Sequence, residues 1–131
     1  MPRLRYRIIS VFTLLATLLA LLLSGEHLAM LAGWWPWRDG ASAASYSNQD
    51  KLVHAGMFAI SGYFVVLGWV SRNIQAIPLY LGLLALGGCT EWLQGNIPGR
   101  GADNWDLVAD AAGAAVGVTL GLCSLRRNPP G

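Results

Sequence analysis

The sequence has few charged residues, few cysteines and few histidines. Only 12% of its 131 residues are charged, 54% are hydrophobic, and it contains two cysteines and two histidines. With a mean hydropathy of +0.45, the chain is too apolar for an ordinary soluble domain, and its length leaves room for one domain. The composition therefore indicates a membrane protein.

Basic patches and nucleophile motifs are also missing. The net charge is +2 and the basic residues are dispersed, so we expect no nucleic-acid partner. No serine or cysteine stands with a histidine in a recognisable nucleophile motif, so acyl-enzyme chemistry has no support. Cys89 and Cys123 should lie at different depths of antiparallel helices, so we expect small apolar residues in helix packing and no disulfide.

Long apolar stretches dominate what is present. Each approaches the roughly 20 residues that span a bilayer. The sequence predicts an all-α fold, a four-helix transmembrane bundle that forms one domain over residues 1–131, with helices at about 8–25, 52–70, 78–95 and 105–125. The first stretch resembles a signal peptide, but no small-residue cleavage site directly follows it, so we expect a retained helix.

The links between these stretches indicate their orientation. We expect the cluster Trp34-Trp35-Pro36-Trp37 to lie at the headgroup level, with binding of a flat or sugar-bearing ligand as the alternative. Gly40 to Ser47 should form a flexible loop. Six basic residues fall on the side of the termini (Arg3, Arg5, Arg7, Arg72, Arg126 and Arg127) and three on the other side (Arg38, Lys51 and Arg100). The positive-inside rule then places both termini in the cytoplasm, in a multi-pass protein of the plasma membrane.

Polar residues gather at the predicted outer helix ends. They begin the second helix (Asp50, Lys51, His54), end the third (Glu91, Gln94) and begin the fourth (Asp106, Asp110). Residues three or four apart share a helix face, so we expect His54 to align with Phe58, Ser61 and Val65, Glu91 with Gly87 and Gln94, and the two aspartates with Gly113, Gly117 and Gly121. Because small-residue stripes allow close helix approach, these carboxylates should face other helices.

Three interpretations of this polar layer are open. It is a satisfied network that locks helix packing, a binding or catalytic site, or a proton or ion path. For a site, the catalytic candidates are His54, Glu91 and Asp110, with the imidazole as general base oriented by a carboxylate. The ligand-binding candidates are Asp50, Lys51, Gln94, Arg100 and Asp106.

Cofactor and ligand chemistry are less specified. Arg100, in the glycine-rich turn after Pro98, is expected either to clamp a phosphate or carboxylate, or to pair with Asp103 or Asp106. Several carboxylates with one imidazole suit a hard or borderline divalent cation, but no signature such as H-E-x-x-H is present, so no metal site is predicted.

The polar blocks resemble those of the VanZ-like family of small integral membrane proteins. The similarity covers Asp50 to about Gly121, through Asp50-Lys51-x-x-His54-x-x-x-Phe58, Glu91-x-x-Gln94, Pro98-Gly99-Arg100 and Asp106-x-x-x-Asp110-x-x-Gly113. Many members carry asparagine at the position of Asp110. The resemblance implies a cell-envelope protein linked to resistance to the glycopeptide antibiotic teicoplanin, which acts outside the membrane on wall precursors. A bilayer lipid or a wall precursor is then the expected ligand.

Overall fold

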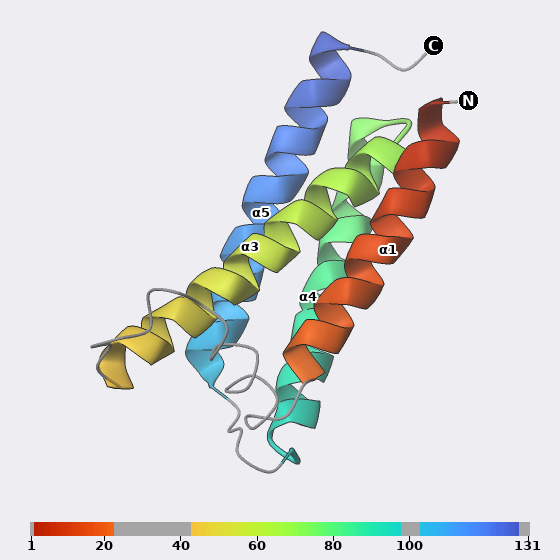
Figure 1. The fold of residues 1–131 in the computed structure, drawn as a ribbon. Helices are drawn as coiled ribbons and strands as arrows, with labels where there is room; N and C mark the ends of the chain where they lie inside the picture. The colour runs from red at the N-terminus through yellow and green to blue at the C-terminus, as the bar shows by residue number, and fades with distance from the viewer. Residues whose placement is uncertain (1, 23–42, 98–102, 129–131) are drawn as a thin grey trace, which may run out of the picture.

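The computed structural model describes residues 2–22, 43–97 and 103–128. Four long helices make up this part of the chain: α1 (Pro2–Leu22), α3 (Ala43–Trp69), α4 (Ala76–Gln94) and α5 (Asn104–Arg127) (Figure 1). A short 3-10 helix, η1 (Asn73–Gln75), leads into α4. All four are long and apolar enough to cross a membrane, so the all-α, four-helix prediction is confirmed.

Close packing of α3 against α5 holds the centre of the bundle. A Cβ built on Gly113 would lie 2.1 Å from the carbonyl oxygen of Ala55, and one built on Gly117 would lie 2.0 Å from that of Ala59. A methyl group cannot fit at either distance, so the two backbones are in direct contact. The predicted small-residue stripe is therefore a helix contact, and it continues to Gly121, which is also buried.

Helix α1 packs on α3 through hydroxyl groups as well as apolar side chains. The hydroxyls of Thr17 and Ser61 lie 3.0 Å apart in a buried pair, and the indole N–H of Trp69 donates to Ser10 at 3.1 Å. Such small polar side chains form hydrogen bonds between helices where lipid offers none. These contacts make α1 part of the bundle.

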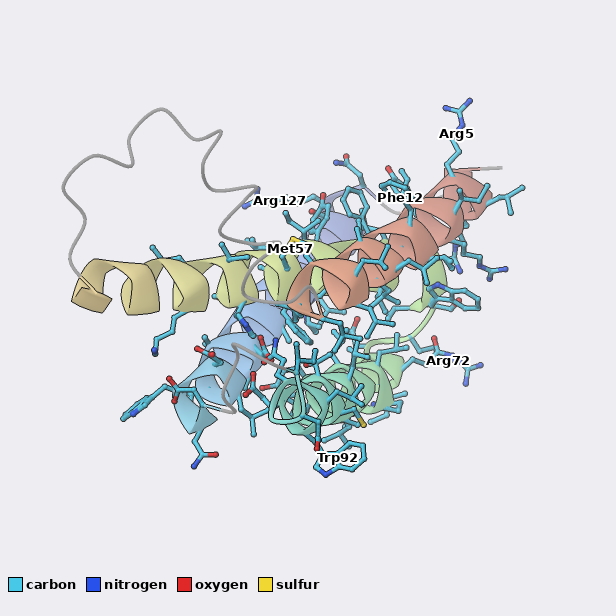
Figure 2. The ribbon with its side chains drawn as sticks, turned by 60° about the horizontal axis from the view of Figure 1, so that its bottom comes forward. Arg5, Phe12, Met57, Arg72, Trp92 and Arg127 are labelled. Carbon is cyan, nitrogen blue, oxygen red and sulfur yellow. The ribbon has the colours of Figure 1, made fainter. Side chains whose placement is uncertain are left out.

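The bundle exposes large apolar side chains and buries several polar side chains beside its apolar core. Large apolar side chains such as Phe12 and Trp92 are 72% and 71% exposed, and both point away from the helices (Figure 2). Buried positions instead include nine polar or charged side chains: Ser10, Thr17, His54, Ser61, Thr90, Glu91, Gln94, Asp106 and Asp110. An aqueous protein would bury the first set and expose the second, so this distribution fits helices surrounded by lipid.

The helix bounds differ from the predicted ones mainly at two N-terminal ends. The predicted loop from Gly40 to Ser47 is wrong from Ala43 onward, where α3 already begins. This segment has alanines and neither glycine nor proline until Gly56, so the helix extends at little cost. Lys51 and His54 consequently lie inside α3 and do not start it. Helix α1 likewise begins at Pro2, since proline is tolerated in a first turn.

Two further expectations concern the cysteines and the tryptophan cluster. Cys89 and Cys123 are both free, as expected, but both are exposed, so a role in helix packing is wrong. The cluster from Trp34 to Trp37, with Arg38, lies outside the described residues.

The two ends of the bundle are chemically different. The first turn of α1 and the last turn of α5 lie at one end, with the turn between α3 and α4 (Figure 1). The C-terminal ends of α1 and α4 and the N-terminal part of α5 lie at the other end, and the buried carboxylates lie toward it.

Candidate functional site

Three helices each contribute one ionisable side chain to a buried cluster. His54 of α3 places Nδ1 2.9 Å from Oδ1 of Asp110 on α5 and 4.0 Å from Oε1 of Glu91 on α4. His54 and Asp110 are fully buried, and Glu91 is 7% exposed. We call His54, Glu91 and Asp110 the acid–histidine cluster. The structure thus brings together the three residues predicted as catalytic candidates.

Helical spacing explains why the three side chains meet. His54 shares its buried face with Phe58, Ser61 and Val65, and Glu91 shares its face with Gly87 and Gln94. Asp110 sits directly on the glycine face of α5 that packs against α3. All the predicted face alignments are therefore confirmed, and each turns its ionisable residue inward.

A second set of charges lies beside the cluster, closer to the helix ends. The Lys51 ammonium is 3.2 Å from a carboxylate oxygen of Asp103 and 3.8 Å from one of Asp106. Asp103 also caps α5, because its side chain accepts the backbone N–H of Trp105 at 2.9 Å. This hydrogen bond, followed by the one from Lys51, lowers the pKa of Asp103 below its ordinary value of 3.8.

Asp103 was not among the predicted site residues, yet it orients one of them. Its backbone N–H donates to Oε2 of Glu91 at 3.0 Å, so the start of α5 fixes the carboxylate of α4. The sequence does contain a signal for Asp103, since an aspartate directly before an apolar helix is a common N-cap.

The cluster retains two carboxylate oxygens without a donor. Among the described residues, neither Oε1 of Glu91 nor Oδ2 of Asp110 has a hydrogen-bond partner, although both are buried. A buried acceptor without a donor normally costs free energy, and such groups are rare in native structures. These two oxygens therefore mark where the cluster can receive a proton, a cation or a ligand.

Some predicted ligand-binding residues lie elsewhere. The Gln94 amide donates to the backbone carbonyl of Leu21 at 2.7 Å, so it ties α4 to the end of α1. Lys51 and Asp106 belong to the second set of charges. Asp50 lies in α3 with its side chain outside the described residues, and Arg100 lies outside them altogether.

The comparisons with known proteins return no match: no family model, no curated protein and no solved structure is similar to this chain. Chemical interpretation therefore depends on the geometry. A buried imidazole against one carboxylate, with a second carboxylate in reach, can accept and return a proton or coordinate a cation.

Proposed function

We propose that the chain is a VanZ-like multi-pass protein of the plasma membrane, with both termini in the cytoplasm. In this proposal the acid–histidine cluster binds or modifies a lipid or wall-precursor ligand at the outer face. The observation that carries it is the 2.9 Å contact between His54 and Asp110, with Glu91 at 4.0 Å, in the interior of a bundle of apolar helices. Burying two carboxylates beside one histidine is costly, and intramembrane ionisable groups usually serve a function.

The chemistry supported best is acid–base catalysis or polar recognition by His54. Asp110 orients the imidazole and stabilises its protonated form, as a carboxylate does for a general base. Glu91 supplies a second proton-accepting oxygen on the same side. The link to teicoplanin comes from the VanZ-like sequence blocks, and an outward-facing site suits a ligand located outside the membrane.

A scaffold is the second candidate, and two interhelical contacts favour it. Gln94 joins α4 to α1, and Lys51 joins α3 to the start of α5. In a scaffold the same charges only hold the helices together, so removing them should cost stability first.

Expression in a teicoplanin-susceptible bacterium tests the proposal. The wild-type chain should raise the lowest inhibitory concentration of teicoplanin. His54→Ala and Glu91→Gln should return it to the value of cells without the protein, at unchanged protein level and thermal stability in detergent. Tyr63→Phe, which removes a hydroxyl paired with Ser124 and outside the cluster, is the control and should protect like the wild type.

Two results contradict parts of this proposal. If the wild-type chain gives no protection, the link to teicoplanin resistance is wrong. Loss of protein level and thermal stability together with protection, in both cluster variants, supports the scaffold and contradicts the site.

A further inference from the structure

We infer that the acid–histidine cluster is a binding site for a divalent metal cation of the zinc type. His54, Glu91 and Asp110 each offer one ligand atom, and these atoms lie within 4.8 Å of one another. Tetrahedral metal bonds of about 2.0–2.2 Å place neighbouring ligand atoms about 3.3–3.6 Å apart. The 2.9 Å pair would have to open by ~0.4 Å, and the widest pair would have to close by ~1.2 Å.

The carboxylate oxygens that lack a donor supply the independent observation. Asp110 is fully buried, and its Oδ2 has no hydrogen-bond partner among the described residues; the same holds for Oε1 of Glu91. Oε1 is also the glutamate oxygen nearer to His54 Nδ1, at 4.0 Å. A cation between these atoms would satisfy oxygens that the protein itself leaves without donors.

The charge of the cluster also favours a divalent cation. Two ionised carboxylates beside a neutral imidazole carry a charge of −2, which one divalent cation cancels. Lys51, the only lysine in the sequence, lies 3.2 Å from Asp103 and 3.8 Å from Asp106. A neutral metal complex therefore explains how Glu91 and Asp110 are both accommodated in an apolar bundle.

Neighbouring groups hold the ligands in place. The backbone N–H of Asp103 fixes Oε2 of Glu91 and leaves Oε1 directed to the cluster, as outer hydrogen bonds do in metal sites. Gly87 leaves space for the other carboxylate, because a Cβ there would lie 2.9 Å from Oδ2 of Asp110.

The donor set selects the class of cation. One imidazole and two carboxylates suit a borderline cation such as Zn²⁺, whereas Mg²⁺ keeps most of its water and Ca²⁺ takes six or more oxygens. Three protein ligands also leave a coordination position for water or for an oxygen of a bound ligand.

The inference rests on the proposed function in that it concerns the same site, where the imidazole of His54 would bind the metal instead of acting as a general base. The test of the metal site needs no lipid or wall precursor, so the metal site and the proposed function can fail separately. The wild-type protein, purified in detergent and stripped with a chelator, is dialysed against Zn²⁺ and analysed for zinc by mass spectrometry. One zinc per chain and a higher melting temperature are expected, with no comparable effect of Mg²⁺ or Ca²⁺.

Matched variants locate the bound metal. Glu91→Gln and Asp110→Asn should weaken zinc affinity by at least about tenfold. Tyr63→Phe, which removes a hydroxyl paired with Ser124 and outside the cluster, should bind like the wild type. Circular dichroism and gel filtration show whether each variant is folded.

A measurement on the wild type alone keeps the inference testable if a variant does not fold. Co²⁺ bound to one imidazole and two carboxylates should show visible absorption without the thiolate charge-transfer band that Cys89 or Cys123 would give. Less than one zinc per two chains, a thiolate band, or equal affinity in folded Glu91→Gln would each overturn the inference.

Discussion

Asp110 is the residue on which the polar cluster depends most directly. Its carboxylate is fully buried, contacts His54, and lies against a glycine of the neighbouring helix α4. A Cβ at Gly87 would meet Oδ2 at 2.9 Å and the Asp110 Cβ at 3.3 Å, whereas one at Gly88 would meet nothing within 4 Å. Two adjacent glycines therefore differ sharply in what they contact.

Gly87→Ala should displace the Asp110 carboxylate from His54 and destabilise the bundle by about 1–3 kcal/mol, the usual range for overpacking a tight site. Gly88→Ala is the matched control. It should be neutral or should stabilise the helix by up to about 1 kcal/mol, because alanine favours helix over glycine. Thermal unfolding in detergent measures both. Equal melting temperatures for the two variants would contradict a steric clash between a Cβ at position 87 and the Asp110 carboxylate.

Asp103 combines a helix cap with an ion pair, and two substitutions separate these roles. Asp103→Ser keeps a side-chain oxygen for the N–H of Trp105 and loses the partner of Lys51, whereas Asp103→Ala loses both contacts. We expect Asp103→Ala to lower the melting temperature by a few degrees and Asp103→Ser to lower it less. A drop in Asp103→Ser as large as in Asp103→Ala would mean that the cap contributes nothing.

The pH dependence of Asp103 has a definite sign. Its pKa is lowered in the folded protein because the N–H of Trp105 and the Lys51 ammonium stabilise the charged form. The charged form therefore adds stability at any pH above its ordinary value of 3.8, and this contribution disappears as the pH falls through the lowered folded pKa. The melting-temperature difference between wild type and Asp103→Ser should be present at neutral pH and vanish below the lowered pKa of Asp103. A difference that persists there contradicts the assignment.

At the scale of the helices, the contact between α3 and α5 is the least adjustable feature. Gly117→Ala would place a methyl group 2.0 Å from the backbone oxygen of Ala59, and backbone atoms cannot rotate away as a side chain can. The helices must separate, so we expect a loss of about 3 kcal/mol or more, at the upper end of overpacking effects. Gel filtration and thermal unfolding in detergent should show reduced folded protein.

Gly56→Ala is the control for this helix pair. Gly56 is on α3, the helix that faces Gly117 of α5. A Cβ at Gly56 would meet nothing within 4 Å, so the substitution should leave the folded fraction unchanged. Normal folding of Gly117→Ala would contradict the direct backbone contact between α3 and α5.

The helices could largely be predicted from the sequence because apolar length and face periodicity are local properties. The start of α3 could not, since Ala43 to Ser47 is compatible with either loop or helix and only the folded chain decides. The glycine stripe indicated that Asp110 faces another helix, and the structure adds which residue it meets. That His54 pairs with Asp110 more closely than with Glu91 depends on helix rotation and depth, which spacing does not contain. The partner of Gln94 could not be predicted for the same reason, because it is a backbone carbonyl of α1.

At the scale of the whole molecule, arginines gather at the end of the bundle opposite the buried carboxylates. Arg3 donates to Ser71 at 2.6 Å and Arg7 to the carbonyl of Gly68 at 3.1 Å, so the start of α1 meets the end of α3. Arg126 and Arg127 end α5 on the same side (Figure 1). Basic residues are retained on the cytoplasmic side of membrane proteins, so this end should face the cytoplasm and the cluster end should face outward.

Cysteine labelling tests this orientation. Cys89 and Cys123 are exposed and must first be replaced by serine. In that background Ser45→Cys, near the start of α3, should react with a membrane-impermeant maleimide in intact cells. Asn128→Cys, at the exposed end of α5, should react only after the cells are opened. The reverse pattern would place the acid–histidine cluster near the cytoplasmic face. An outer-leaflet or wall-precursor ligand would then be out of its reach, whereas zinc binding by the purified protein would be unaffected.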